Sequence, residues 1–265
     1  MKKAVLILAA VLLGWTLQAQ QVFGPGEDLR YSVMYKWGAV NTEVAQASAV
    51  LDKGSWKGQE GLYSCLELRT APFFDVFYKM RDKFQGWFLE DSLLPIHYER
   101  STRENSYSAD NIYDYDWKAG KISATLAYNG APAEVKDIEI GRPSLCDVAS
   151  LLYFFRRTAA SAGSMTPGQQ IPVHFVIDDE VFDLTMTYQG KEVKRIRRIG
   201  KVNCLRFSCT VLSGTLFDGK DPLMLWFSDD GNCLPMAFNA PLKIGAVQGW
   251  LSSSKNLTNP FSAKL

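Results

Sequence analysis

Residues 84–95 read FQGWFLEDSLLP, and residues 223–235 read LMLWFSDDGNCLP. Each stretch predicts the same three pieces in order: an aromatic strand, an acidic turn, and a Leu-Pro pair that opens the next strand. Proline suits the first residue of a strand, where no backbone N–H is needed for the ladder. The connection is too short for a parallel crossover, so each stretch predicts an antiparallel hairpin.

The similarity between these stretches extends over a longer segment. Residues 65–91 align without a gap with residues 204–230, at a constant offset of 139 positions. Six positions are identical, and they form the pairs Cys65/Cys204, Leu66/Leu205, Asp82/Asp221, Trp87/Trp226, Phe88/Phe227 and Asp91/Asp230.

We interpret the chain as two related antiparallel halves, about residues 24–140 and 166–265, joined by a helix over residues 144–158. Chance similarity between two strand-rich segments is the alternative. A common origin predicts that Trp87 and Trp226 lie in related strands.

The rest of the chain also shows the alternation of β-branched, aromatic and polar residues that is typical of strands. The composition is that of a globular protein, because 47% of the 265 residues are hydrophobic and 22% are charged. Further strands are expected at residues 28–37, 62–69, 96–100, 112–117, 121–128, 181–188, 202–212 and 246–251.

One segment has the period of a helix. Ser144 and Asp147 are spaced as in a capping box, in which Ser144 caps the first turn. One apolar face follows, formed by Val148, Leu151, Leu152 and Phe155. The prediction is therefore a mainly β protein: a single domain over residues 20–265, with an antiparallel curved sheet or barrel built from two related halves and one packed α-helix.

Residues 1–19 have the pattern of a secretory signal peptide. Lys2 and Lys3 precede a short apolar run over residues 4–13. That run is shorter than the ~20 residues of a membrane span, although an uncleaved anchor is the alternative. We expect a periplasmic protein that is not an integral membrane protein. The mature chain would carry 27 basic and 28 acidic residues, which gives no reason to expect a nucleic-acid partner.

The cysteines and histidines do not have the spacing of a metal site. Five cysteines and two histidines are present, and no C-x2-C pair occurs. An odd number of cysteines leaves at least one thiol unpaired in a monomer, and the sequence does not determine the connectivity. We therefore predict no metal and no other cofactor.

No catalytic motif is present, since G-x-S-x-G, H-E-x-x-H and a phosphate-binding glycine loop are all missing. We interpret His97 and His174 as structural or surface residues and propose no catalytic residue. The basic run 191–201 is either a solvated hairpin or a contact for anionic polymers or lipids. Carboxylates that a glycosidase pair would need are available, although turn formation is the simpler interpretation: Asp75, Asp82, Glu90, Asp91, Asp221, Asp229 and Asp230.

Four residues are candidates for ligand binding. Trp37 and Trp117 lie near predicted strand ends, where an aromatic side chain can line a concave site. Tyr153 and Arg156 lie on the predicted helix. The tryptophans that recur in both halves are better explained by packing.

Several short motifs resemble an exported bacterial family known as domain of unknown function 3108. The resemblance implies an envelope or periplasmic location and a mainly β fold, and it implies no activity and no catalytic residues. It rests on F-x-x-G-E-x-L-x-Y at residues 23–31, T-x-P at 70–72, Arg-Asp at 81–82, the helix 147–156, and W-x-S-x-D at 226–230 followed by Leu-Pro at 234–235.

Three functions are open at this point. The first is a scaffold that binds or carries an apolar or amphipathic envelope ligand, a lipid or a glycan, between the helix and the sheet. A structure whose interior is completely filled by side chains would contradict this function. The second is a structural component of an envelope complex with a protein partner, which predicts an exposed apolar patch or a free strand edge. The third is a carboxylate-dependent hydrolase of envelope glycans, which needs acidic residues in one cleft.

Overall fold

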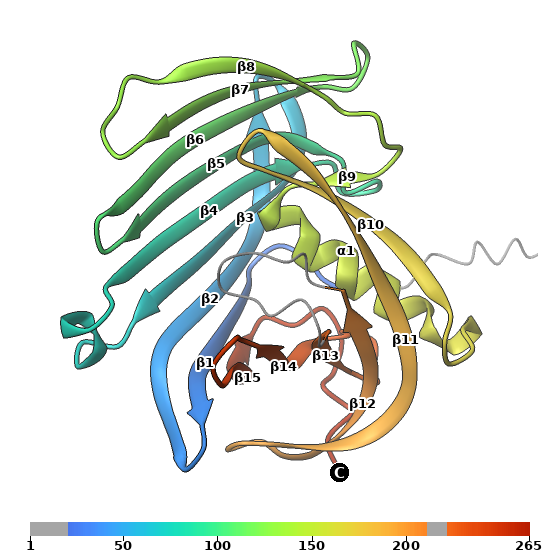
Figure 1. Cartoon of the computed structure of the whole chain (residues 1–265). Coiled ribbons are helices and arrows are strands. Elements are labelled where there is room, and N and C mark those ends of the chain that lie inside the picture. The colour runs from blue at the N-terminus through green and yellow to red at the C-terminus, as the bar shows by residue number, and fades with distance from the viewer. Residues whose placement is uncertain (1–20, 211–221) are drawn as a thin grey trace, which may run out of the picture.

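The computed structural model describes residues 21–210 and 222–265, and in that part of the chain fifteen strands form one sheet. Figure 1 shows the sheet wrapping around a helix, α1 (Val148–Ala160). The 3-10 turns are η1 (Phe74–Val76) and η2 (Ser161–Ser164). The strands are β1 (Glu27–Trp37), β2 (Val40–Trp56), β3 (Gln59–Thr70), β4 (Met80–Phe88), β5 (Pro95–Glu104), β6 (Tyr107–Asp116), β7 (Lys121–Tyr128), β8 (Glu134–Glu139), β9 (Leu145–Cys146), β10 (Gln170–Ile177), β11 (Glu180–Ile196), β12 (Gly200–Cys209), β13 (Leu223–Ser228), β14 (Pro235–Pro241) and β15 (Ala246–Lys255).

The sheet is curved but open. Its order is β8-β7-β6-β5-β4-β3-β2-β1-β15-β14-β13-β12-β11-β10-β9, so β1 and the last strand, β15, pair near its middle. Every pair is antiparallel except the short β9–β10 pair. Within the described residues, β8 and β9 form the two edges and share no ladder, so the sheet does not close into a barrel. The predicted fold class is confirmed in its curved-sheet form.

Short turns produce this meander. Between β7 and β8, Asn129 and Gly130 have positive φ angles of 53° and 73°. Ala131 N–H donates to the Tyr128 carbonyl oxygen at 2.9 Å and closes the turn. Asparagine and glycine tolerate this left-handed backbone best, which is why an Asn-Gly pair predicts a tight hairpin.

The helix begins later than the capping pattern predicted. Leu145 and Cys146 form β9, so Asp147 rather than Ser144 is the N-cap. Ser150 N–H donates to the Asp147 carboxylate at 2.6 Å, and Asp147 N–H donates to the Ser150 hydroxyl at 3.0 Å. The predicted cap residue was therefore wrong, because the chain pairs with β10 before it turns into the helix.

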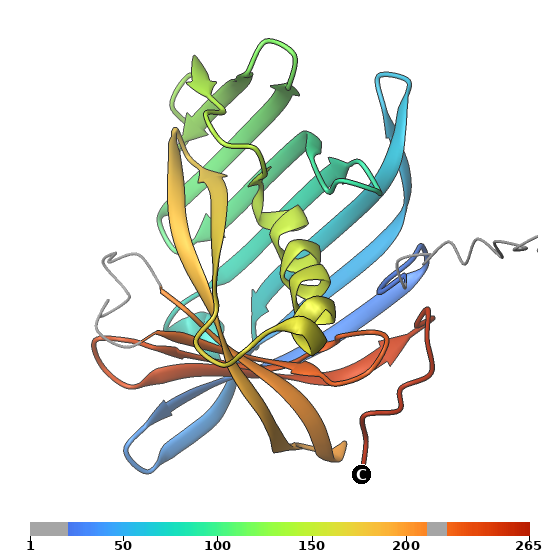
Figure 2. The ribbon, with the colours of Figure 1, turned by 90° about the vertical axis from the view of Figure 1, so that its right-hand side faces the viewer.

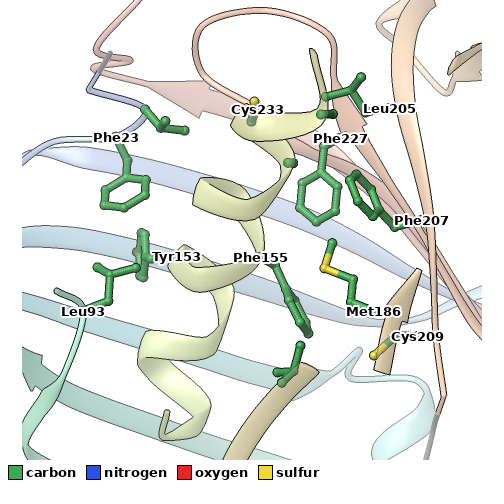
Figure 3. Packing of buried hydrophobic residues seen from close by; sticks show 14 of the residues in the cluster. Phe23, Leu93, Tyr153, Phe155, Met186, Leu205, Phe207, Cys209, Phe227 and Cys233 are labelled. Carbon is green, nitrogen blue, oxygen red and sulfur yellow. The ribbon is translucent and has the colours of Figure 1, made fainter. Parts of the chain in front are cut away.

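Helix α1 packs against the concave face of the sheet (Figure 2). Gly86 on β4 permits close approach, because a Cβ atom there would lie 2.7 Å from the Ala149 Cβ. Farther along the helix, Tyr153 and Phe155 lie among large side chains from both halves of the sheet, including Phe207 and Phe227 (Figure 3). The space between the middle of the helix and the sheet is therefore filled by side chains.

A buried ion pair fixes the C-terminal half of the helix. The Arg156 side chain is fully buried and Glu27 on β1 is 1% exposed, and the guanidinium binds the carboxylate through both Nη atoms. Nη2 also donates to the carbonyl oxygens of Val22, at 3.2 Å, and Asn232, at 3.0 Å. One side chain thus joins the start of β1, the N-terminal segment and the β13–β14 turn.

The tip of the β10–β11 hairpin is bound to the far part of the sheet. Asp178, at that tip, accepts hydrogen bonds from Arg100 at 2.6 Å, Tyr128 at 2.9 Å and Asn111 at 3.2 Å. Its carbonyl oxygen accepts from the Tyr113 hydroxyl at 3.0 Å. These contacts join the β10–β11 hairpin to β5, β6 and β7 across the concave side of the sheet. Among the described residues, no strand pairing links these two parts of the sheet.

The two predicted halves use their strands in the same order. Consecutive strands pair with one another both from β1 to β6 and from β10 to β15. The second strand of each set, β2 or β11, has 17 residues. Trp87 and Trp226 each precede a bulge, after which Phe88 or Phe227 faces the proline that opens the next strand. Their cross-strand partners on the other side differ, and a common origin of the halves stays a prediction.

We expect Glu27→Gln to lower the free energy of unfolding by about 3–5 kcal/mol, because it leaves the buried Arg156 charge without its partner. Urea unfolding followed by circular dichroism measures this. Glu60→Gln, at an exposed position in the β2–β3 hairpin, is the control and should change stability by less than about 0.5 kcal/mol. A loss below about 1 kcal/mol for Glu27→Gln would contradict this account of the ion pair.

Asp147 should make stability depend on pH. Burial raises the pKa of its carboxyl group from 3.8 to about 7, although the Ser150 hydrogen bonds oppose the shift. The folded state therefore holds this proton more tightly than the unfolded state, and its contribution to stability falls as pH rises from about 4 to 7. Asp147→Asn keeps a good N-cap and removes the titration.

We expect the variant to match the wild type near pH 4 and to exceed its free energy of unfolding by about 2–4 kcal/mol at pH 8. Chemical denaturation across this range tests the difference curve, in which other titrating groups cancel. A wild-type advantage at pH 8 would show that the ionised carboxylate is stabilising.

Candidate functional site

A cleft opens at the C-terminal end of α1, with a volume of about 1110 Å³. The helix end contributes Arg157 and Ala160 to its wall, and the N-terminal segment contributes Val22 and Phe23. Two acidic turns also line it: Glu90 and Asp91 after β4, and Asp229, Asp230 and Gly231 after β13. These are the two turns that the internal alignment relates.

Two consecutive arginines hold these turns in place. Arg157 donates to the carbonyl oxygens of Asp91 at 2.5 Å and Glu90 at 2.7 Å. Arg156, its neighbour, donates to the carbonyl oxygen of Asn232 at 3.0 Å. Backbone hydrogen bonds also close each turn, from Leu89 N–H in the first and from Ser228 N–H in the second. The end of the helix therefore sets the distance between the related turns and the width of the cleft.

Most polar groups of the cleft contact other protein groups. The Asp230 carboxylate accepts hydrogen bonds from the Ser228 hydroxyl at 2.8 Å and from three backbone N–H groups. Asp229 forms an ion pair with Lys191 at 2.7 Å, and Glu90 accepts from the Gln21 amide at 3.2 Å. Acidic residues do meet in one cleft, and these contacts give Glu90, Asp229 and Asp230 structural roles.

The apolar part of the cleft comes from Val22, Phe23, Leu205 and Cys233. Burial raises the pKa of the Cys233 thiol to about 12, so this sulfur is not a reactive thiolate at neutral pH. All five cysteines of the chain are free thiols, and four of them are buried.

The four residues predicted to bind a ligand do not form one site. Tyr153 and Arg156 are neighbours in the core, where the guanidinium lies 5.9 Å from the Tyr153 ring, and both side chains are fully buried. Trp37 lies at the end of β1 and is 59% exposed. Trp117 lies in the β6–β7 turn at the opposite end of the strands, and its indole N–H donates to the Pro95 carbonyl oxygen at 2.7 Å. Their role in ligand binding stays a prediction.

A second cluster, which the sequence did not indicate, lies on the outer face of the sheet. The His97 ring stacks on Trp56 with centroids 3.6 Å apart, and Trp87 lies 5.3 Å from it. The two ring nitrogens of His97 face Asp114 at 2.9 Å and Glu99 at 3.2 Å. Although burial opposes it, hydrogen bonds from His97 and Lys57 lower the pKa of Asp114. Cross-strand register brings these residues together, since His97 lies opposite Trp87 on one side and Asp114 on the other. The sequence did not indicate the cluster because it does not show which strands pair.

The other predicted candidates have ordinary structural surroundings. Asp82, interpreted as a turn residue, lies within β4 and accepts a hydrogen bond from Arg103 N–H at 3.2 Å. Asp221 lies outside the described residues. His174 contacts Asp183 at 2.7 Å. In residues 21–210 and 222–265, no group of three histidine, cysteine or acidic side chains could hold a metal ion, and no helix is long and apolar enough to cross a membrane.

The basic run 191–201 forms the end of β11, a turn and the start of β12. Its side chains partly pack on the sheet: the Lys194 ammonium lies 3.5 Å from the centroid of the Trp226 ring, and the Arg197 guanidinium lies 5.9 Å from that of Trp250. Lys191 alone of the run lines the cleft. A role for the run in binding anionic partners stays a prediction.

These features define a class of protein: an open, barrel-like antiparallel sheet that wraps one helix and leaves a cleft at the helix end. A family model covers residues 30–251, and the chain belongs to that family, described as protein of unknown function (DUF3108). The predicted resemblance is therefore confirmed. No curated protein matches the chain.

Two solved structures are similar in fold. The crystal structure of a beta-barrel-like protein of domain of unknown function DUF1849 from Brucella abortus matches with a TM-score of 0.57 and 10% identity, over 90% of this chain and all of that one. A protein with a YmcC-like fold from Bacteroides fragilis matches with a TM-score of 0.31 and 8% identity, over 89% of this chain and 99% of that one. The first likeness supports the barrel-like fold and says nothing of activity.

The hydrogen bonds from Arg157 predict a local effect. We expect Arg157→Met to speed amide exchange at Leu89 and Leu93 by roughly 10–100-fold, because charged hydrogen bonds of about 1.5–3 kcal/mol are lost while the apolar stem remains. The amides of Ser228 and Leu234 in the related turn are the internal control and should change little. Equal acceleration in both turns, or none in either, would contradict the role given to Arg157.

Proposed function

We propose that this is an exported periplasmic protein that binds or carries an amphipathic ligand of the cell envelope in the cleft at the end of α1. The observation that carries the proposal is the cleft itself. Its volume of about 1110 Å³ is slightly above the roughly 300–1,000 Å³ of typical small-molecule sites, so it can hold a molecule as large as a lipid. The periplasmic location is proposed from the signal-peptide pattern of residues 1–19.

The mixed lining favours an amphipathic ligand over a purely apolar or purely polar one. The apolar lining residues Phe23, Val22 and Leu205 are buried in the core and offer only a narrow apolar contact, and Lys191 and Arg157 add positive charge. The Lys191–Asp229 ion pair is partly exposed, and exposed pairs are weak. Lys191 can therefore exchange Asp229 for the phosphate of a zwitterionic head group, which suits a cleft whose four carboxylates (Glu90, Asp91, Asp229 and Asp230) outnumber its two basic side chains.

The location differs from the one that the sequence suggested. A ligand between helix and sheet would have to displace Tyr153, Phe155 and their neighbours, which fill that space. The cleft at the helix end needs no such displacement. Binding there uses the same helix, but its last turn rather than its apolar face.

The two other functions have less support. Both features that a structural component predicts are present in the described chain: the exposed apolar side chains of Phe73, Val76 and Phe77, and a free strand edge at β8. The edge residues are mostly charged, as is common where an edge must avoid pairing, so the apolar side chains are the stronger of the two features. A hydrolase needs a pair of available carboxylates, and three of the four cleft carboxylates, those of Glu90, Asp229 and Asp230, contact other protein groups, which leaves Asp91 without a second available carboxylate among the described cleft residues.

The cleft can be blocked by one substitution. Ala160 is exposed and lines the cleft, so Ala160→Trp should fill it without disturbing the core. Thr166→Trp places the same side chain at an exposed position nearby that does not line the cleft, and it is the matched control. Each protein is purified gently from the periplasm and studied by native mass spectrometry, with lipid extraction.

We expect the wild type and Thr166→Trp to carry a discrete extra mass that extracts as lipid. The fraction of Ala160→Trp that carries this mass should be at least about tenfold lower. A clean ligand-free mass for the wild type would overturn carriage of a tightly bound ligand. An extra mass that Ala160→Trp leaves unchanged would place the ligand elsewhere.

A further inference from the structure

One end of the sheet carries three exposed apolar tips. The first is the end of β1, where Trp37 is 59% exposed, and the second is the β14–β15 turn, where Ile244 is 62% exposed. The third is the turn around η1, between β3 and β4, with Phe73, Val76 and Phe77 exposed by 73%, 85% and 72%.

Strand register places these tips at the same end. Trp37 faces Val40 across the β1–β2 turn, and Lys36 faces Ala246 at the start of β15. Strand β3 ends beside the start of β2, because Ala71 N–H donates to the Val44 carbonyl oxygen at 2.8 Å. The η1 turn projects beyond the ends of β3 and β4 in Figure 1.

The η1 tip is held firmly although its apolar side chains are exposed. Asp75 forms two hydrogen bonds with Arg81, at 2.5 and 3.0 Å, and accepts another from the Thr70 hydroxyl at 2.5 Å. Phe73 and Phe77 lie with ring centroids 6.2 Å apart. The internal charges are therefore neutralised within the turn while its apolar side chains point outward as a group.

A lysine adjoins each tip. Lys36 precedes Trp37, Lys243 precedes Ile244, and Lys79 follows the η1 turn, and all three lysines are exposed. An apolar side chain with a neighbouring lysine suits the boundary of a membrane, where the apolar part enters the acyl region and the ammonium group stays among the head groups.

We propose that this end of the sheet docks reversibly on the surface of a bilayer that contains anionic lipid. Phe73, Val76 and Phe77 would form the main contact, with Trp37 and Ile244 as secondary contacts. The three lysines favour anionic head groups and make the binding sensitive to salt. The contact is peripheral, because only residues at turns and at one strand end enter the membrane.

The arrangement distinguishes this surface from scattered surface hydrophobics. Val135 and Val193 are also exposed, but each stands on a strand without a cluster of aromatic neighbours. Single exposed apolar residues are ordinary on proteins, whereas grouped ones mark interaction surfaces. The tips lie at the other end of the strands from the cleft, so the inference does not depend on what the cleft binds.

Vesicle flotation tests the proposal with the exported form of the protein, its processed N-terminus confirmed by mass spectrometry. The vesicles contain phosphatidylcholine alone or mixed with phosphatidylglycerol. We expect the wild type to bind the mixed vesicles, and Phe73→Ala/Phe77→Ala to bind them at least about tenfold more weakly. Ile112→Ala/Val135→Ala removes exposed apolar side chains from strands outside both the tips and the basic run, and should bind like the wild type.

Replacing Lys36, Lys79 and Lys243 together by glutamine should abolish most of the preference for mixed vesicles and its salt dependence. Brominated lipids provide a second measurement that needs no phenylalanine variant: they should quench fluorescence of the wild type more than that of Trp37→Phe. Absence of flotation with mixed vesicles would overturn the proposal. An equal loss of vesicle binding in both double variants would also overturn it. Self-association that only Phe73→Ala/Phe77→Ala abolishes would overturn it too, because a second copy of the chain would then cover this surface.

Discussion

The buried pair of Arg156 and Glu27 is the interaction on which the rest of the structure depends. Burying two charges is costly, and the cost is offset only when close partners surround them. Here both Nη atoms bind the carboxylate, and Nη2 also binds two backbone carbonyl oxygens. The pair joins α1 to β1, and the two carbonyl oxygens add the N-terminal segment and the β13–β14 turn, so one side chain contacts all three segments around the helix. It therefore selects one position of the helix over the sheet.

The cleft follows from that position. With Arg156 fixed, Arg157 points to the other related turn and binds its carbonyl oxygens. The helix thus lies between two turns of similar sequence and leaves an open space at its end. At the N-terminal end of the helix, Gly86 allows Ala149 to approach β4 closely. The contacts of Asp178 with β5, β6 and β7 then hold the curved sheet around the helix where its edges do not pair.

The two ends of the strands differ in chemistry. One end has the cleft, with acidic turns, two basic side chains and a small apolar floor. The other has exposed apolar side chains, each tip beside a lysine. A protein that receives or delivers an amphipathic molecule at a membrane would need both a site that binds the molecule and a surface that docks on the membrane. The arrangement gives the proposed binding function and the proposed docking surface separate locations, so each can be tested alone.

The sequence by itself determined what depends on neighbours along the chain: the alternating strands, the Asn129-Gly130 turn, the apolar face of the helix and the family motifs. Only the tertiary structure decided that Tyr153 and Arg156 are buried, that Trp37 and Trp117 lie at opposite ends, and that His97 meets Asp114. These facts depend on register and on the helix position, which arise from contacts between residues far apart in sequence. Local periodicity reports which face of an element is apolar, but it does not report what that face meets.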